Sequence, residues 1–431
     1  MAGAQGSGQG SVMQFFGRQV GRSLRRVTSG LLRGGNTPTR LRAWMVGTAV
    51  VAVLFGVLGA LGISRRDASL GDAAAASQQL IAVQDIRVRL VHADALATEN
   101  YLRGGIEDAT KRATYVSELA AVGDALVQAG NRVLPNEATR LAEVSTALGV
   151  YSGLIEQARA NNRQGYPVGQ AYLKVANDKV LEMAATLRGV ELSLRHQVND
   201  NLDRADRAGV WIHALGWTLL LLVVVGGGWV AVRFRRLVNV PLALAAMLTL
   251  VLVAAAARVQ GSAMNDAESA ASTSLQSADL AAQGRSAAFD AHTQESLTLI
   301  NRGNGAANEA NWQTAAITTR RALKTLCRRG ECDPSTQFEA YAKLHKTIRD
   351  LDNDGDWDGA VQSSLTMASA AFDKFAGASE TVTANLSSDA SRAMSTSSNG
   401  LGAMRVLVLI GGLLIAALTL AGYGQRLREY R

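Results

Sequence analysis

The residues best suited to hold a metal ion are five aspartates that alternate with other residues between positions 350 and 358. Positions one, three, five, six and nine of a calcium-binding loop are matched by Asp350, Asp352, Asp354, Gly355 and Asp358. Position twelve is Val361, where such a loop places a glutamate that binds calcium through both oxygens. The alternative is an acidic turn between two helices, in which Asp356 or Asp358 caps the second helix. We favour the turn and predict no metal site.

The two cysteines, Cys327 and Cys332, are separated by four residues and followed by Asp333-Pro334. A short loop of this kind suits a disulfide in an oxidising compartment. A metal site needs more nitrogen or sulfur ligands than two cysteines supply, and His345 is the nearest histidine. Free thiols are the remaining alternative. The spacing predicts a disulfide, and nothing in the chain predicts a cofactor.

The main structural elements that the sequence predicts around these residues are four apolar stretches. They cover residues 43–63, 208–232, 240–258 and 405–424. Each has about the 20 residues that a helix needs to cross a bilayer. The stretches leave two long segments, 64–207 and 259–404, and three short ones, 1–42, 233–239 and 425–431. We therefore predict a multi-pass protein of the plasma membrane with two large soluble segments.

The three short segments are rich in arginine, which predicts their side of the membrane. If four helices alternate in direction, all three lie on one side, and the positive-inside rule makes that side cytoplasmic. Both termini are then cytoplasmic and both long segments are extracytoplasmic. The net charge of +8 comes mainly from these short segments. It therefore does not indicate a nucleic-acid partner.

Each long segment has the apolar periodicity of helices, with hydrophobic residues three and four apart. In the first segment four such stripes are separated by Gly104-Gly105, by 131–135 and by 165–167. In the second we expect helices at about 260–302, 308–326, 335–351 and 358–402. Up-down connections then give an all-α fold of two four-helix bundles in tandem, a duplicated unit of span, bundle and span. The sequence does not say whether the bundles pack together or what the oligomeric state is.

The turns farthest from the membrane are the candidate partner-binding surface. The residues singled out there are Asn100, Tyr101, Arg103, Gly104, Gly105, Glu107, Arg302, Gly303, Asn304, Gly305, Asp354, Asp356, Trp357 and Asp358. The plainer interpretation of Arg103 and Arg302 is a basic residue at a helix C-terminus followed by a glycine cap. Both interpretations stay open at this point.

A second candidate surface consists of arginines in the short basic segments. They are Arg18, Arg22, Arg25, Arg26, Arg233, Arg235 and Arg236. Arginines of this kind bind anionic lipid headgroups, and they also suit a cytoplasmic protein partner.

The chain has no sequence motif of an enzyme. It lacks a P-loop, a Gly-x-Ser-x-Gly nucleophile motif and a His-Glu-x-x-His zinc motif. The expected cytoplasmic parts are far shorter than a catalytic domain. We expect a protein that is not an enzyme and that passes a signal to a separate cytoplasmic partner.

Two strings in the long segments resemble a known family. The string at 93–107 contains Thr-Glu-Asn-Tyr-Leu-Arg-Gly-Gly, and the string at 295–306 contains Asn-Arg-Gly-Asn-Gly. Together with Gly355 to Ala360, they resemble the signatures of GlnX-type membrane sensor proteins of actinobacteria. The resemblance implies a relay in which an extracytoplasmic solute-binding lipoprotein (GlnH) captures aspartate or glutamate. The membrane protein then signals to a cytoplasmic serine/threonine kinase, protein kinase G.

Two alternatives of other classes remain. One is a receptor similar to chemoreceptors, which binds a small ligand directly between its helices against an arginine such as Arg87, Arg89 or Arg188. The other is a structural membrane scaffold, which responds to no ligand.

Overall fold

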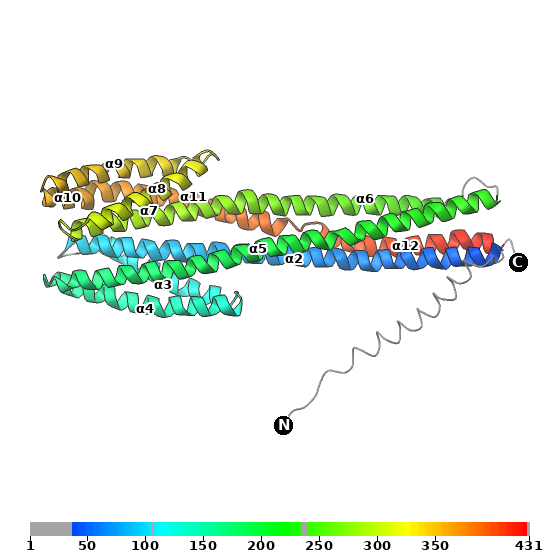
Figure 1. The fold of residues 1–431 in the computed structure, drawn as a ribbon, viewed down its shortest axis with the longest axis horizontal. Helices are drawn as coiled ribbons and strands as arrows, with labels where there is room; N and C mark the ends of the chain where they lie inside the picture. Colours follow the sequence, from blue (N-terminus) through cyan, green and yellow to red (C-terminus); the bar gives the residue numbers. More distant parts are fainter. Residues whose placement is uncertain (1–36, 106, 235–238, 429–431) are drawn as a thin grey trace, which may run out of the picture. The chain divides into compact units, whose positions relative to one another are not determined.

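The computed structural model describes residues 37–105, 107–234 and 239–428 of the chain. The first half has four helices: α2 (Thr37–Arg103), α3 (Ala109–Gly130), α4 (Pro135–Arg163) and α5 (Val168–Phe234). The second half begins with α6 (Val240–Ser269), the π-helical turn η1 (Ala270–Leu275), α7 (Gln276–Ile300), α8 (Ala306–Cys327) and α9 (Asp333–Asn353). It ends with α10 (Trp357–Ser363), the π-helical turn η2 (Ser364–Ala368), α11 (Ser369–Thr396) and α12 (Leu401–Arg428). Figure 1 shows this order along the chain.

The predicted fold class is confirmed, because the described residues form helices and no strand. Four helical stretches are long and apolar enough to cross a bilayer. Helices end where the sequence predicts breaks: Gly104, Gly165, Gly303 and Gly355 have φ angles of 65°, 71°, 75° and 88°. This left-handed region favours glycine because a side chain would be strained there.

One predicted helix is wrong in its extent. A single helix was expected over 358–402, but α11 ends at Thr396 and α12 begins at Leu401. Gly400, in the turn between them, has φ +90°. A serine- and asparagine-rich stretch that ends in glycine favours a helix C-terminus, and here it overrides the helical pattern on either side.

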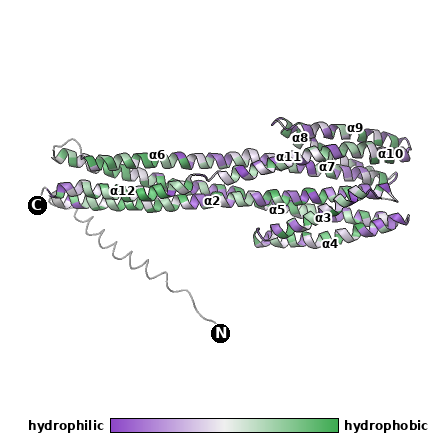
Figure 2. Cartoon of the chain, turned by 180° about the vertical axis from the view of Figure 1, so that it is seen from behind, coloured by the Kyte–Doolittle hydropathy of each residue, from purple (hydrophilic) through white to green (hydrophobic). Residues whose placement is uncertain are grey.

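The described residues divide into two compact units. The first contains residues 37–68, 204–234, 239–264 and 399–428, and therefore includes the four predicted membrane spans. Hydrophobic residues are concentrated in its helices, as the colouring of α6 and α12 in Figure 2 shows. Within it α2 and α12 approach closely, since a Cβ atom on Gly412 would lie 2.6 Å from the Cα atom of Gly56. The predicted sidedness of the membrane stays a prediction.

The second unit contains residues 69–203 and 265–398, so both long segments fold into one body. We call it the sensor unit, after the sensor proteins that its strings at 93–107 and 295–306 resemble. Helix α7 lies deep in it, with Ala288, Ala291 and Ser296 fully buried. Small side chains let neighbouring helices approach α7 on several faces. The alanine and serine content of α7 is therefore what permits its burial.

A disulfide joins Cys327 and Cys332 in the turn between α8 and α9, with their Cα atoms 4.0 Å apart. Replacing both cysteines by serine is expected to lower the free energy of unfolding by about 2 kcal/mol, because the reduced unfolded chain regains the entropy of a short loop. Thermal unfolding of the full chain in detergent, with and without dithiothreitol, measures this. Dithiothreitol should lower the melting temperature of the natural protein and leave that of the variant unchanged. An equal effect on both would contradict the prediction.

Candidate functional site

The turns that follow α2, α4, α7 and α9 lie at one end of the sensor unit, and we call them the tip surface. The Asn162 side chain donates a hydrogen bond to the Tyr101 carbonyl at 2.8 Å. The Gln170 amide donates to the Asn301 side chain at 2.6 Å, which joins the two segments. The Trp357 indole N–H donates to the Leu299 carbonyl at 2.9 Å. The structure thus brings together tip residues from both halves of the chain.

In the first segment, the predicted tip residues are largely engaged within the protein. The Glu107 carboxylate forms an ion pair with Arg159 through both of its oxygens, with one contact at 2.6 Å. Arg103 lies 3.9 Å from the buried Glu99. Asn100 is buried as well. These residues shape the turn rather than offering free charge to a partner, whereas Gly104 and Gly105 provide its left-handed backbone.

In the second segment, the predicted tip residues form a cavity of about 700 Å³. Its lining includes Arg302, Gly303, Gly305, Asp356, Trp357 and Asp358. The Arg302 guanidinium lies 3.6 Å from the centroid of the Trp357 ring, a cation–π contact. The backbone of Arg302 has φ +27°, which is strained for a residue with a side chain. Asn304 and Asp354 are exposed beside the cavity but do not line it.

The acidic run at 350–358 forms the end of α9, a turn and the start of α10. Asp356 is the N-cap residue of α10, and its side chain accepts a hydrogen bond from the Gly359 amide at 3.0 Å. This is the arrangement expected of the acidic turn. In the part of the chain that the structure describes, no three side chains are placed to hold a metal ion.

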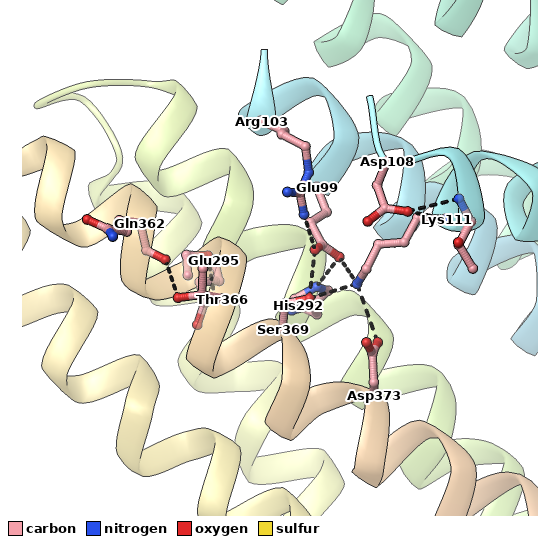
Figure 3. Close-up of polar contacts among 12 residues, drawn as sticks. Glu99, Arg103, Asp108, Lys111, His292, Glu295, Gln362, Thr366, Ser369 and Asp373 are labelled. Atoms are coloured by element: carbon pink, nitrogen blue, oxygen red, sulfur yellow. Dashed lines mark hydrogen bonds and ion pairs between the residues drawn. The ribbon is translucent and has the colours of Figure 1, made fainter. Parts of the chain in front are cut away.

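Beneath the tip surface, Glu99 of α2 is the centre of a buried polar cluster (Figure 3). Its carboxylate accepts hydrogen bonds from Lys111 of α3 at 2.7 Å and from Ser369 of α11 at 2.8 Å, and it lies 3.2 Å from Nε2 of His292 of α7. One carboxylate therefore joins four helices from both segments. We call Glu99, Arg103, Lys111, His292 and Ser369 the Glu99 cluster.

Opposite charges stabilise the ionised form of Glu99. Burial by itself would raise the pKa of this carboxyl group. The hydrogen bond and charge of His292, together with those of Lys111, outweigh burial and hold the pKa at about 2. Glu99 is therefore a buried carboxylate whose charge is matched only while these helices stay in place.

A second buried carboxylate, Glu295 of α7, lies near this cluster along the same helix. It accepts a hydrogen bond from Ser364 at 3.0 Å and lies 2.9 Å from Nδ1 of His345 of α9. The other ring nitrogen of His345 lies 3.2 Å from Glu309 of α8, and the ring stacks on Trp312 at 3.6 Å. Ser364 begins η2, and π-helical turns often occur at functional sites. We call Glu295, Glu309, His345 and Ser364 the Glu295 cluster.

The pKa values of His345 and Glu309 in the Glu295 cluster are shifted by their contacts. Burial would lower the pKa of His345, but its hydrogen bonds to Glu295 and Glu309 and their negative charges outweigh burial and raise it. Burial would raise the pKa of Glu309, but hydrogen bonds from His345 and Gln313 outweigh it and lower the pKa. A positive imidazolium between two carboxylates is thus favoured.

Sequence reasoning missed both clusters, although a signal was present. Glu99 lies in the string at 93–107, and Glu295 lies in the string at 295–306. In both helices the residues on either side of the glutamate are buried. A charged residue on the buried face of a helix is rare unless it is paired. The partners could not be found in this way, because His292 is 193 residues from Glu99.

The basic candidates lie almost entirely outside the described residues. This holds for Arg18, Arg22, Arg25, Arg26, Arg235 and Arg236. The backbone of Arg233 belongs to the last turn of α5. Their assignment to lipid or to a cytoplasmic partner stays a prediction.

Comparison with known proteins gives one finding. Residues 69–202 match a family described as the actinobacterial sensor domain. The match covers nearly all of the first segment of the sensor unit and none of the second. No curated protein and no solved structure matches the chain. This match, in a chain with four helices that could span a bilayer, supports a sensing role at a membrane.

Proposed function

We propose that this protein is a non-enzymatic transmembrane relay for amino-acid availability. In this proposal its tip surface binds an extracytoplasmic solute-binding lipoprotein that has captured aspartate or glutamate. The relay passes the occupancy of that lipoprotein to a cytoplasmic serine/threonine kinase. The resemblance of the strings at 93–107 and 295–306 to GlnX-type sensors suggests the ligand and both partners.

The observation that carries the proposal is that both segments contribute to one tip surface. An interface for a globular partner needs an area to which several turns contribute, and the turns after α2, α4, α7 and α9 supply it. Tryptophan and arginine are enriched among residues that dominate binding energy. Trp357 and Arg302 lie at the cavity in this surface and therefore suit the centre of an interface.

A path for the signal begins at the same residues. Trp357 is hydrogen-bonded to Leu299 at the end of α7, and α7 also contributes His292 and Glu295. A partner that shifts Trp357 or the end of α7 would therefore act on both buried clusters. Packed helices respond to such a shift by moving between discrete arrangements, because buried ion pairs tolerate little intermediate displacement. The helices α2, α5 and α6 each run without a break from the sensor unit into the unit that contains the spans.

The test is capture of partners by the full-length protein in detergent, with and without aspartate or glutamate, read by mass spectrometry. The natural protein should retain a solute-binding lipoprotein in a ligand-dependent manner, together with a soluble kinase. Replacing Trp357 by alanine should weaken lipoprotein binding by about 2 kcal/mol, or roughly 30-fold in Kd, as expected for a central interface residue. Arg302→Ala should act in the same direction.

Arg321→Ala is the matched control for Arg302→Ala, because Arg321 is exposed on α8 and lies outside the tip cavity. Its binding of the lipoprotein should equal that of the natural protein. Capture that is unaffected by Trp357→Ala would remove the tip surface from the proposal. Absence of both partners, with no dependence on aspartate or glutamate, would favour the scaffold alternative.

A further inference from the structure

A second cavity of the sensor unit, of about 690 Å³, lies between α2 and α5 of the first segment and α7 and α8 of the second. We call it the central groove. Its volume falls within the range of small-molecule sites. It does not share lining residues with the tip cavity, so an inference from it does not depend on binding at the tip surface.

Most charges in the central groove neutralise one another. Arg87 forms an ion pair with Glu191 at 2.7 Å and also donates a hydrogen bond to Ser286 at 2.9 Å. Arg195 forms an ion pair with Asp279 at 2.7 Å. These four side chains need no ligand to satisfy their charge.

Three charged side chains of the groove are left over. Among the residues that the structure describes, Arg188, Asp94 and Asp290 take part in no ion pair. Arg188 is exposed at the groove, whereas Asp94 is 1 % exposed. The groove therefore presents one guanidinium near solvent and two carboxylates, of which one is deeply buried.

The deeper carboxylate is incompletely satisfied. Asp94 accepts a hydrogen bond from Asn177 at 2.8 Å through Oδ2. Its other oxygen, Oδ1, is buried and has no donor within hydrogen-bonding geometry, although the Tyr151 hydroxyl group is close enough to affect the carboxyl group. A buried carboxylate oxygen without a donor costs free energy. A ligand that supplies N–H donors would relieve that cost.

The ionisation of the two carboxyl groups supports a cationic donor. Burial, together with the charge of Asp290, raises the pKa of Asp94 to about 6 against the opposing effects of Asn177 and the Tyr151 hydroxyl group. Burial also raises the pKa of Asp290, and the opposing effects of the Gln294 hydrogen bond and the Arg188 charge do not cancel it. Two carboxyl groups with raised pKa values favour a neighbouring positive charge.

We propose that the central groove binds a small zwitterion, of which the α-amino acids are the simplest class. The ammonium group of the ligand lies between Asp94 and Asp290, and its carboxylate pairs with Arg188. Val91, Val180 and Ala184 provide apolar contacts for a side chain. Since both segments line the groove, a bound ligand would hold α2 and α5 against α7 and α8.

The experiment measures binding to the full-length protein in detergent by isothermal titration calorimetry. The probes are the twenty L-amino acids, with putrescine as a ligand that has only positive charges and glutarate as one that has only negative charges. At least one amino acid should bind, and neither putrescine nor glutarate should bind as tightly. Arg188→Gln and Asp290→Asn should each weaken that binding by at least about tenfold, because each removes one charged partner of the ligand.

Lys174→Gln is the matched control, since Lys174 is an exposed cation on α5 that does not line the groove. Its affinity for the amino acid should equal that of the natural protein. Asp290→Asn preserves the shape of the side chain, and its melting temperature establishes that it folds. Absence of amino-acid binding, or binding that neither variant weakens, would overturn the proposal. Equal binding of putrescine would overturn the assignment of a zwitterion.

Discussion

Replacing Glu99 by glutamine is expected to lower the free energy of unfolding by about 3–5 kcal/mol, the usual cost of removing one partner from a buried ion pair. The variant keeps the size of the side chain but leaves Lys111 and His292 without their buried counter-charge. Thermal unfolding of the full chain in detergent measures the loss. Glu143→Gln is the matched control, because Glu143 is exposed on α4, and its melting temperature should not change.

The pH dependence of the same comparison is specific to Glu99. Its pKa is lowered from 4.5 to about 2 in the folded protein. A depressed carboxyl pKa stabilises the folded state above the unfolded value, and this stabilisation is lost as the pH falls through the folded value. The difference between natural protein and Glu99→Gln should therefore be full above about pH 4.5 and shrink toward pH 2, by about 3 kcal/mol. A difference that stays constant over this range would contradict the assigned role of the charge.

Replacing His345 by glutamine is expected to cost about 3 kcal/mol near pH 6, because it leaves Glu295 buried without a positive partner. The pKa of His345 is raised, so its stabilisation is fully present below the unfolded value of 6.5 and is lost as the pH rises through the folded value. The melting temperatures of the natural protein and the variant, measured from pH 6 to 9, should therefore converge as the pH rises. Loss of the stacking contact with Trp312 leaves a smaller difference that does not depend on pH.

His196→Gln is the control for this series, because His196 is exposed on α5. Its melting temperature should follow that of the natural protein at every pH. A gap between natural protein and His345→Gln that widens with rising pH would show that His345 is neutral in the folded protein. The paired charges of the Glu295 cluster would then need another explanation.

The two clusters also limit how the sensor unit can respond to a partner. Both contain residues of α7, and α7 is hydrogen-bonded to the tip surface through Leu299 and Trp357. The central groove is lined by other residues of α7, including Asp290 and Gln294. Tip binding and groove binding would therefore act on one helix. If both occur, each should change the affinity of the other by the same factor.

Several features of this protein follow from the local sequence alone. The four helical stretches that could span a bilayer are set by apolar length, and the helix ends at Gly104, Gly303 and Gly355 are set by residues that tolerate left-handed backbone. The N-cap at Asp356 follows from its position before a helix. The sequence also placed Arg302 and Trp357 at turns, but it did not indicate the cavity that they line. Each of these properties depends on residues close together along the chain.

Only the tertiary structure decided how the two halves meet. The pattern of apolar residues fixes which face of a helix is buried, but not which helix covers it. The pairing of Glu99 with His292, the three unpaired charges of the central groove and the union of both segments in one unit all join residues far apart in the chain. For the same reason Glu107, which the sequence offered as a partner-binding residue, is paired with Arg159 inside the protein. Charge can be read from the sequence, but its neutralisation depends on contacts that form when the helices pack.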